Sequence, residues 1–354
     1  MPLAFPNRLL LSALAVMVFF VSCCEKDPPI EADLLPMEIE VPAHFRAIEI
    51  PANNELTPAK VALGKRLFFD PILSIDSTVS CGSCHIASSA FADPRRFSLG
   101  FEGRKSTRQS MAIMNLAYAR SLFWDGRSTT LESQVIDPIL NPLEMANDTA
   151  TVMARLENHP YYKEEFKRVF GDPVLRFSQV EMAIANFERT MVSANSKYDK
   201  FVAAGFDSTL FTPAEWRGYK LYFTEEIGVN HAECFHCHGG FNLDETTGAF
   251  RSNGLDQFYD DLGRANVTQN NKDIGKFKVP SLRNIEYSAP YMHDGRFNTL
   301  EEVVAHYASG GQKNVNQDPL INNIRLTEQE QADVVAFLKT FSDPDFITNP
   351  EFQP

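Results

Sequence analysis

The chain has 354 residues, of which 44% are hydrophobic and 22% are charged. This is the composition of an ordinary globular protein, long enough for two modest domains, and it excludes a largely disordered chain. The formal net charge of −13 argues against nucleic acid as a partner and would steer a basic protein toward the surface.

Residues 1–22 are predicted to be a signal peptide. Arg8 precedes the apolar run 9–21, which is too short to span a bilayer comfortably. The run ends in Ser22-Cys23, which is similar to the lipobox of bacterial lipoproteins, where the cysteine is lipidated. We therefore expect a lipoprotein anchored through Cys23 on the periplasmic side of a bacterial membrane. An ordinary secretory signal followed by two cysteines without function is the alternative.

Residues 23–56 are rich in Pro and Glu without a helical period, which predicts a lipoprotein tether and an N-terminal arm. Beyond them the sequence repeats itself. The pattern G-x-x-L-[FY]-F begins at Gly64 and Gly218, and a C-x-x-C-H motif follows each copy. This repeat predicts two related domains, residues 57–205 and 206–354.

Each predicted domain closes on an amphipathic helix, over residues 177–191 and 326–341. We expect the two helices to begin with the capping boxes Ser178-x-x-Glu181 and Thr327-x-x-Glu330. Apolar residues at helical spacing predict the core-facing stripes Val180, Ile184, Phe187, Met191 and Val334, Phe337, Leu338, Phe341. Strand signals are sparse and the intervening segments are rich in Gly, Pro and Asn, so we expect an all-α fold with long loops.

The two C-x-x-C-H motifs are Cys81-Gly-Ser-Cys84-His85 and Cys234-Phe-His-Cys237-His238. Two thiols on one helical turn followed by an imidazole are typical of c-type haem attachment, in which the cysteines form thioethers and the histidine binds iron. A zinc site or a disulfide could use the same cysteines, but neither needs a histidine after the second one in both copies. We therefore predict two covalently bound haem c groups, one in each domain.

The ligand opposite His85 is not evident from the sequence. The next histidine along the chain is His159, whereas Met111, Met114 and Met145 lie closer. A haem with both axial positions filled carries electrons, and one with an open position can do chemistry. The absence of a nearby histidine favours an open position, and the methionines keep six-coordination as the alternative.

The segments "LFFDPILS", "SCGSCH", "FWDGR…LESQ…P…NPLEM" and "PYMHDGRFNTLEEVV" resemble the bacterial di-haem cytochrome c peroxidase and MauG superfamily. The resemblance covers residues 57–341 and implies two cytochrome c-like domains. It assigns peroxide chemistry to the His85 haem and electron entry to the His238 haem. It also implies that Gln134 and Glu144 line the peroxide pocket and that Trp124 lies between the haems.

The same resemblance implies a calcium ion between the domains, near Gln109, Ser288 and Pro290. Oxygen ligands suit calcium, although Gln109 stands where the superfamily usually has asparagine. That longer side chain puts the calcium site in question.

Two further positions bear on the subtype. Phe101 stands where typical peroxidases of this kind carry a removable histidine, so we expect the His85 haem to be five-coordinate without reductive activation. At the second haem, Tyr307 stands where MauG-type proteins have a tyrosine, and Met292 and His306 are the competing ligands. A tyrosinate would stabilise ferric iron and lower the reduction potential relative to methionine.

The sequence thus predicts an oxidoreductase that reduces hydrogen peroxide to water. Electrons from a small cytochrome c or cupredoxin would enter at the C-terminal haem and pass to the N-terminal haem. A MauG-like enzyme that uses peroxide to oxidise side chains of a partner protein, and a non-catalytic electron-transfer cytochrome, are the alternatives. A homodimer is compatible with the sequence, which does not define the oligomeric state.

Overall fold

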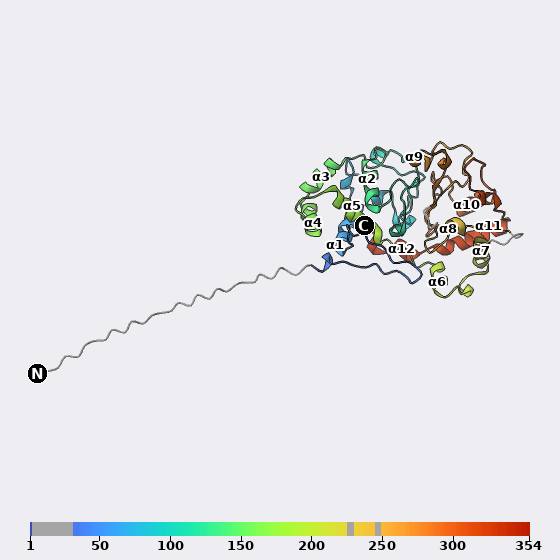
Figure 1. Ribbon diagram of the computed structural model, residues 1–354, viewed down its shortest axis with the longest axis horizontal. Helices are drawn as coiled ribbons and strands as arrows, with labels where there is room; N and C mark the ends of the chain where they lie inside the picture. The colour runs from blue at the N-terminus through green and yellow to red at the C-terminus, as the bar shows by residue number, and fades with distance from the viewer. Residues whose placement is uncertain (2–30, 225–229, 245–248) are drawn as a thin grey trace.

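The computed structural model describes residue 1 and residues 31–224, 230–244 and 249–354. Residues 2–22 of the predicted signal peptide and Cys23 lie outside the described residues. The described part is mostly helical, as expected, and its strands are β1 (Phe250–Arg251) and β2 (Phe277–Lys278), which pair antiparallel (Figure 1). Its α-helices are α1 (Pro58–Phe69), α2 (Leu131–Leu140), α3 (Thr149–Asn158), α4 (Pro160–Phe170), α5 (Phe177–Thr190), α6 (Lys197–Ala203), α7 (Pro213–Phe223), α8 (Phe235–His238), α9 (Ala265–Thr268), α10 (Leu300–Ala308), α11 (Glu328–Leu338) and α12 (Pro344–Thr348).

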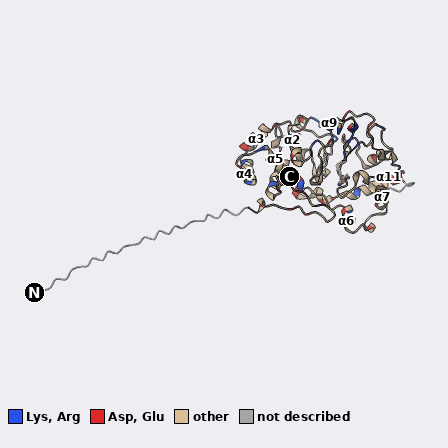
Figure 2. Cartoon of the chain, viewed as in Figure 1, with Lys and Arg blue, Asp and Glu red and all other residues tan. Residues whose placement is uncertain are grey.

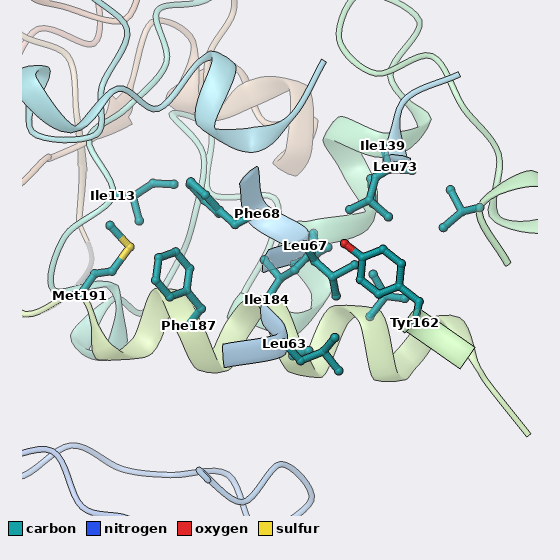
Figure 3. Packing of buried hydrophobic residues seen from close by; sticks show 14 of the residues in the cluster. Leu63, Leu67, Phe68, Leu73, Ile113, Ile139, Tyr162, Ile184, Phe187 and Met191 are labelled. Carbon is teal, nitrogen blue, oxygen red and sulfur yellow. The ribbon is translucent and has the colours of Figure 1, made fainter. Parts of the chain in front are cut away.

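The N-terminal half, residues 57–205, is organised by the contact between α1 and α5. Thr57 caps α1, because its Oγ1 accepts from the backbone N–H of Lys60 at 3.3 Å. Gly64 lets the two helices approach closely, since a Cβ at this position would lie 1.9 Å from the carbonyl oxygen of Ala183. The buried side chains at this contact include, in Figure 3, Leu63, Leu67, Phe68, Ile184 and Phe187.

The C-terminal half, residues 206–354, repeats this contact with α7 and α11. Gly218 is the counterpart of Gly64, and a Cβ there would lie 2.0 Å from the carbonyl oxygen of Asp333. The G-x-x-L-[FY]-F repeat of the sequence is therefore a repeated helix crossing. In each half this crossing supports the C-x-x-C-H motif that follows the first helix of the pair.

The predicted core stripes are confirmed, and one of the two predicted capping boxes is wrong. All eight stripe residues are buried. Thr327 and Glu330 form the expected reciprocal box at the start of α11. In contrast, Ser178 lies inside α5, and the capping residue is Arg176, two residues earlier, where the Gln179 side chain accepts from the backbone N–H of Arg176 at 2.9 Å. Gln179 therefore takes the role expected of Glu181, but for the N–H of Arg176 rather than that of Ser178.

Two terminal segments connect the halves. The arm before α1 contacts both of them: Asn54 donates to Glu132 at 2.6 Å and His44 lies 3.0 Å from Asp199 of α6, both in the N-terminal half, and the Phe45 ring lies 4.9 Å from the Phe241 ring of the C-terminal half. Asp199 also accepts two hydrogen bonds from Arg283 of the C-terminal half, whose side chain is fully buried. At the other end of the chain, the C-terminus returns to α1 (Figure 1).

Charged residues of both signs are scattered along the chain in both halves (Figure 2). Among the described residues, no helix has the length and apolar character needed to cross a membrane.

Candidate haem-binding site

A single cavity of about 940 Å³ is lined by both C-x-x-C-H motifs. Its walls come from both halves of the chain, because α2 and the loops after the first motif face the loops around β2 and α10. Of the predicted site residues, it brings together the following: Cys81, Cys84, His85, Cys234, Cys237, His238, Trp124, Gln134, Glu144, Tyr307, Met292, Gln109, Ser288 and Pro290.

At the N-terminal motif the histidine is held in one tautomer. His85 Nδ1 lies 2.8 Å from the carbonyl oxygen of Phe91, and a carbonyl can only accept, so Nδ1 carries the proton and Nε2 keeps its lone pair. Burial lowers the pKa of His85, which favours the neutral ring. A neutral imidazole oriented through a backbone carbonyl is the form that binds haem iron.

The C-terminal motif has the same arrangement. His238 Nδ1 lies 3.0 Å from the carbonyl oxygen of Pro280, which fixes the equivalent tautomer. The backbone around it is held by Tyr222, whose hydroxyl donates to the carbonyl oxygen of His238 at 2.7 Å. Both motifs therefore meet the same structural requirement for an axial histidine.

The four motif cysteines are not joined in disulfides. Burial raises the pKa of the Cys84 thiol to about 11 and that of Cys234 to about 12, so these thiols are neutral near pH 7. Zinc binds thiolates, and the described part of the chain contains no group of three or more His, Cys, Asp and Glu residues arranged for a metal ion. Neutral thiols beside an oriented histidine in a large cavity fit thioether attachment of haem.

Glu144 and Gln134 line the cavity from one end of α2 and the turn that follows it. Gln134 lies on α2, and Glu144 lies just beyond its end. Burial raises the pKa of Glu144, and a hydrogen bond of 2.7 Å from Asn141 Nδ2 to its Oε1 partly offsets this. The carboxyl is thus held in a fixed orientation near the His85 motif.

The loop that contains Phe101 is fastened to the Glu144 segment. The backbone N–H of Phe101 donates to the carbonyl oxygen of Glu144 at 2.6 Å. Gly100 lies so close that a Cβ would be 2.2 Å from the carbonyl oxygen of Leu143. The loop therefore helps to position the backbone of Glu144 as well as the phenyl ring of Phe101.

The methionines near the first motif are placed differently from one another. Met111, Met114 and Met145 all line the cavity. The sulfur of Met114 accepts from Asn284 Nδ2 at 3.3 Å, and Met145 is 2% exposed within the core of the N-terminal half. Two of the three alternative ligands for the His85 haem are thus already engaged in packing or hydrogen bonding.

Near the second motif, Tyr307 and Met292 converge on one side chain. Asn253 Nδ2 lies 3.4 Å from the hydroxyl oxygen of Tyr307 and 3.3 Å from the sulfur of Met292. Burial raises the pKa of Tyr307 to about 12. His306, the third competing ligand, instead directs Nε2 toward the carbonyl oxygen of Asn253 at 3.1 Å and does not line the cavity.

Trp124 lies at the boundary between the halves. Its Nε1 donates to the carbonyl oxygen of Gln109 at 2.8 Å, and its own carbonyl oxygen accepts from the backbone N–H of Lys278 on β2. The Gln109 amide donates to the carbonyl oxygen of Asp93 at 3.2 Å. The indole is therefore fixed by the N-terminal half and joined through its backbone to the C-terminal half.

Sequence reasoning missed Glu188 of α5, which lines the cavity and is 4% exposed. Its Oε2 has no hydrogen-bond partner in the described structure, and burial raises its pKa to about 8. The neighbouring Arg189 donates to Asn186 and Glu132 instead. The available signal was an acidic residue four positions after Ile184 of the buried stripe, where the helical period predicts burial.

Comparison with known proteins agrees with this geometry. The di-haem cytochrome c peroxidase family matches residues 58–206, and the cytochrome c family matches residues 217–342. The methylamine utilization protein MauG of Methylorubrum extorquens is 35% identical over 341 residues, covering 94% of each chain. The chain belongs to the di-haem cytochrome c peroxidase family.

Other similar proteins include one named as a cytochrome-c peroxidase and one named as MauG-like. The cytochrome-c peroxidase IdrP1 of Denitromonas iodatirespirans is 34% identical, over 83% of this chain and 84% of the relative. The crystal structure of a MauG-like protein associated with microbial copper homeostasis is 35% identical with a TM-score of 0.82, covering 89% of this chain and 98% of that one.

Membership confirms the mostly helical fold with two cytochrome c-type domains and the class of enzyme, a cytochrome-c peroxidase family oxidoreductase. The family and the two motifs together imply two haem c groups.

Proposed function

We propose that this protein reduces hydrogen peroxide to water at the haem attached through Cys81, Cys84 and His85, using electrons from a small cytochrome c or cupredoxin. The observation that carries the proposal is the position of Glu144 and Gln134, which line the same cavity as this motif. When bound, the N-terminal haem supplies the iron that activates peroxide, and the C-terminal haem receives electrons from the donor.

Glu144 is suited to move a proton. Burial disfavours its charged form, and Asn141 holds Oε1 in place, so the carboxyl can accept a proton from one peroxide oxygen and return it to the other as the bond between them breaks. Gln134 presents an amide that can both donate and accept, which suits it to orient the peroxide. Together they would favour heterolytic cleavage.

The loop containing Phe101 supports a site that is ready without activation. Phe101 cannot ligate iron, and its backbone is anchored to that of Glu144. We expect the His85 haem to be five-coordinate and high-spin in the fully oxidised protein. A six-coordinate low-spin spectrum for this haem would contradict the expectation and favour one of the cavity methionines as a ligand.

Tyr307 is our proposed axial ligand of the His238 haem, with Met292 as the alternative. Both residues line the cavity and share Asn253 as a neighbour, whereas His306 is turned away. A tyrosine ligand favours the second candidate function, oxidation of side chains of a partner protein, because tyrosinate stabilises oxidised iron. The relatives named MauG and those named peroxidase match to a similar degree.

A stopped-flow experiment separates these functions. The fully oxidised holoprotein is mixed with one equivalent of hydrogen peroxide and then with reduced cytochrome c, while haem absorbance is recorded. Fast, repeated oxidation of the cytochrome supports the peroxidase. A long-lived spectral change with little turnover supports oxidation of a partner protein, and no reaction with peroxide refutes both and leaves a simple electron carrier.

Three further features belong to the proposal. Gln109, Ser288 and Pro290 line the shared cavity, and a calcium ion held there by neutral oxygens should be removed by a chelator with a change in the haem spectrum.

We propose lipidation at Cys23 on the periplasmic side, so Cys23→Ser should release the protein from the membrane fraction. A homodimer would appear in sedimentation as twice the mass of the chain.

A further inference from the structure

The backbone that orients His85 is itself in an unfavourable conformation. Phe91, whose carbonyl oxygen accepts from His85 Nδ1, has φ +58°, and the preceding Ala90 has φ +52°. Left-handed φ values are unfavourable for residues with side chains, and at two consecutive residues they persist only when the surroundings hold them. The position of the histidine ligand therefore depends on whatever holds Phe91.

The C-terminal tail supplies part of that support. The tail, defined here as residues 344–354, leaves the C-terminal half and crosses to the N-terminal half. Phe346 and Phe352 of the tail pack edge-to-face against the ring of Phe91, with ring centroids 5.6 Å and 6.5 Å away. All three rings are buried, so the tail closes the pocket in which the Phe91 side chain is held.

Polar contacts fix both ends of the tail. Asp343, just before α12, accepts from the Ser193 hydroxyl at 3.0 Å and from the backbone N–H of Asn195 at 3.0 Å. Near the other end, Lys65 Nζ of α1 donates to the carbonyl oxygen of Pro350 at 3.1 Å. The tail is thus a clamped segment rather than a free end.

We propose that the C-terminal tail is a positioning element for the axial histidine of the N-terminal haem. Packing against Phe346 and Phe352 fixes the Phe91 ring and thereby stabilises the left-handed backbone of Phe91. In that conformation the Phe91 carbonyl oxygen accepts the hydrogen bond from His85 Nδ1. A strong acceptor at Nδ1 makes the imidazole a more basic ligand, which stabilises oxidised iron. Phe346 and Phe352 are positioning residues that contact neither the peroxide pocket nor the histidine.

This inference rests on haem attachment at His85 and not on peroxide turnover, so its test reads the ligand directly. The variant is Phe346→Ala in the full-length holoprotein, with Phe346→Leu as the conservative partner. Phe258→Ala is the matched control, because Phe258 is 85% exposed. Resonance Raman spectroscopy of the reduced protein reports the iron–imidazole stretch, and spectroelectrochemistry reports the reduction potential of the N-terminal haem.

We expect Phe346→Ala to shift the stretch to lower frequency and the potential upward, because the hydrogen bond at Nδ1 weakens. Phe346→Leu should restore most of both shifts, and Phe258→Ala should leave both unchanged. A Phe346→Ala protein that loses thermal stability but keeps the stretch and the potential overturns the proposal, since the tail then only stabilises the fold.

The test also covers a variant that does not fold and an N-terminal haem that is six-coordinate. If Phe346→Ala does not fold, Phe352→Ala, which removes the more distant of the two rings, must show the same direction of shift. If the unmodified protein shows no iron–imidazole band because the haem is six-coordinate, the five-coordinate expectation is wrong, and the potential alone then decides the role of the tail.

Discussion

Replacing Glu188 with glutamine should make the protein's stability much less sensitive to pH. Glu188 is buried in the cavity wall with an unpartnered carboxyl oxygen, and burial raises its pKa from the ordinary value of 4.5 to about 8. The neighbouring Arg189 gives little compensation, because it is paired with Glu132. The carboxyl is therefore folded into the protein in its neutral form.

The direction follows from the proton balance. Between about pH 4.5 and pH 8 the folded protein holds a proton on Glu188 that the unfolded chain has lost, so stability falls as the pH rises through this window. Each unit of pKa shift corresponds to about 1.4 kcal/mol, which gives a loss on the order of 4 kcal/mol between about pH 5 and about pH 9. Glutamine has nearly the same shape and does not titrate, so the variant lacks this loss.

Guanidinium unfolding of the holoprotein across that pH range, followed by haem absorbance, measures the effect. Glu164→Gln is the control, because Glu164 is exposed on α4 and does not line the cavity. The difference in stability between Glu188→Gln and the unmodified protein should grow with pH. Parallel pH profiles for the two proteins would refute the reasoning and show that Glu188 finds a partner once haem is attached.

Three other changes test the site and the fold. Glu144→Gln should lower peroxidase turnover by about 10²- to 10⁴-fold with unchanged haem absorbance, whereas Glu102→Gln on the exposed neighbouring loop should not, as steady-state assays can show. Trp124→Phe removes the hydrogen bond to Gln109 and should slow donor-driven turnover without changing the peroxide reaction of the oxidised protein; equal turnover would remove Trp124 from the electron path. Gly64→Ala should lower the stability of the N-terminal half by about 1–3 kcal/mol, because the added methyl group meets backbone across the helix crossing; an unchanged unfolding midpoint would contradict that close contact.

The parts of this protein that were predictable are those encoded over short distances in the sequence. The haem motifs span five residues each, and the helical stripes repeat every three or four residues, so both could be read directly and both are where they were expected. The repeat at Gly64 and Gly218 was visible as a pattern, but its reason, a close helix crossing, needed the structure. Its partner residues lie more than a hundred positions away.

Three features could not be predicted because they depend on tertiary contacts: the residue that caps α5, the position of Glu188 and the packing of Phe91. Ser178 and Glu181 satisfy the capping pattern, yet the Gln179 side chain accepts from the N–H of Arg176, so the helix is capped two residues earlier. The spacing of Glu188 after Ile184 predicts burial, but its place in the cavity wall depends on the tertiary structure. The packing of Phe91 against Phe346 joins residues 255 positions apart, and no periodicity in the chain connects them.

The duplication and the asymmetry of the site have separate physical origins. The paired crossings of α1 with α5 and of α7 with α11 give both motifs the same support, and each axial histidine is oriented by a backbone carbonyl. The halves differ in the other residues that line the cavity: the N-terminal half contributes Glu144, and the C-terminal half contributes Tyr307 and Met292. Because long loops can change without disturbing a helix crossing, the two halves share the same support for the motif and present different residues to the cavity. The tail and the arm then hold the two units in register around their shared cavity.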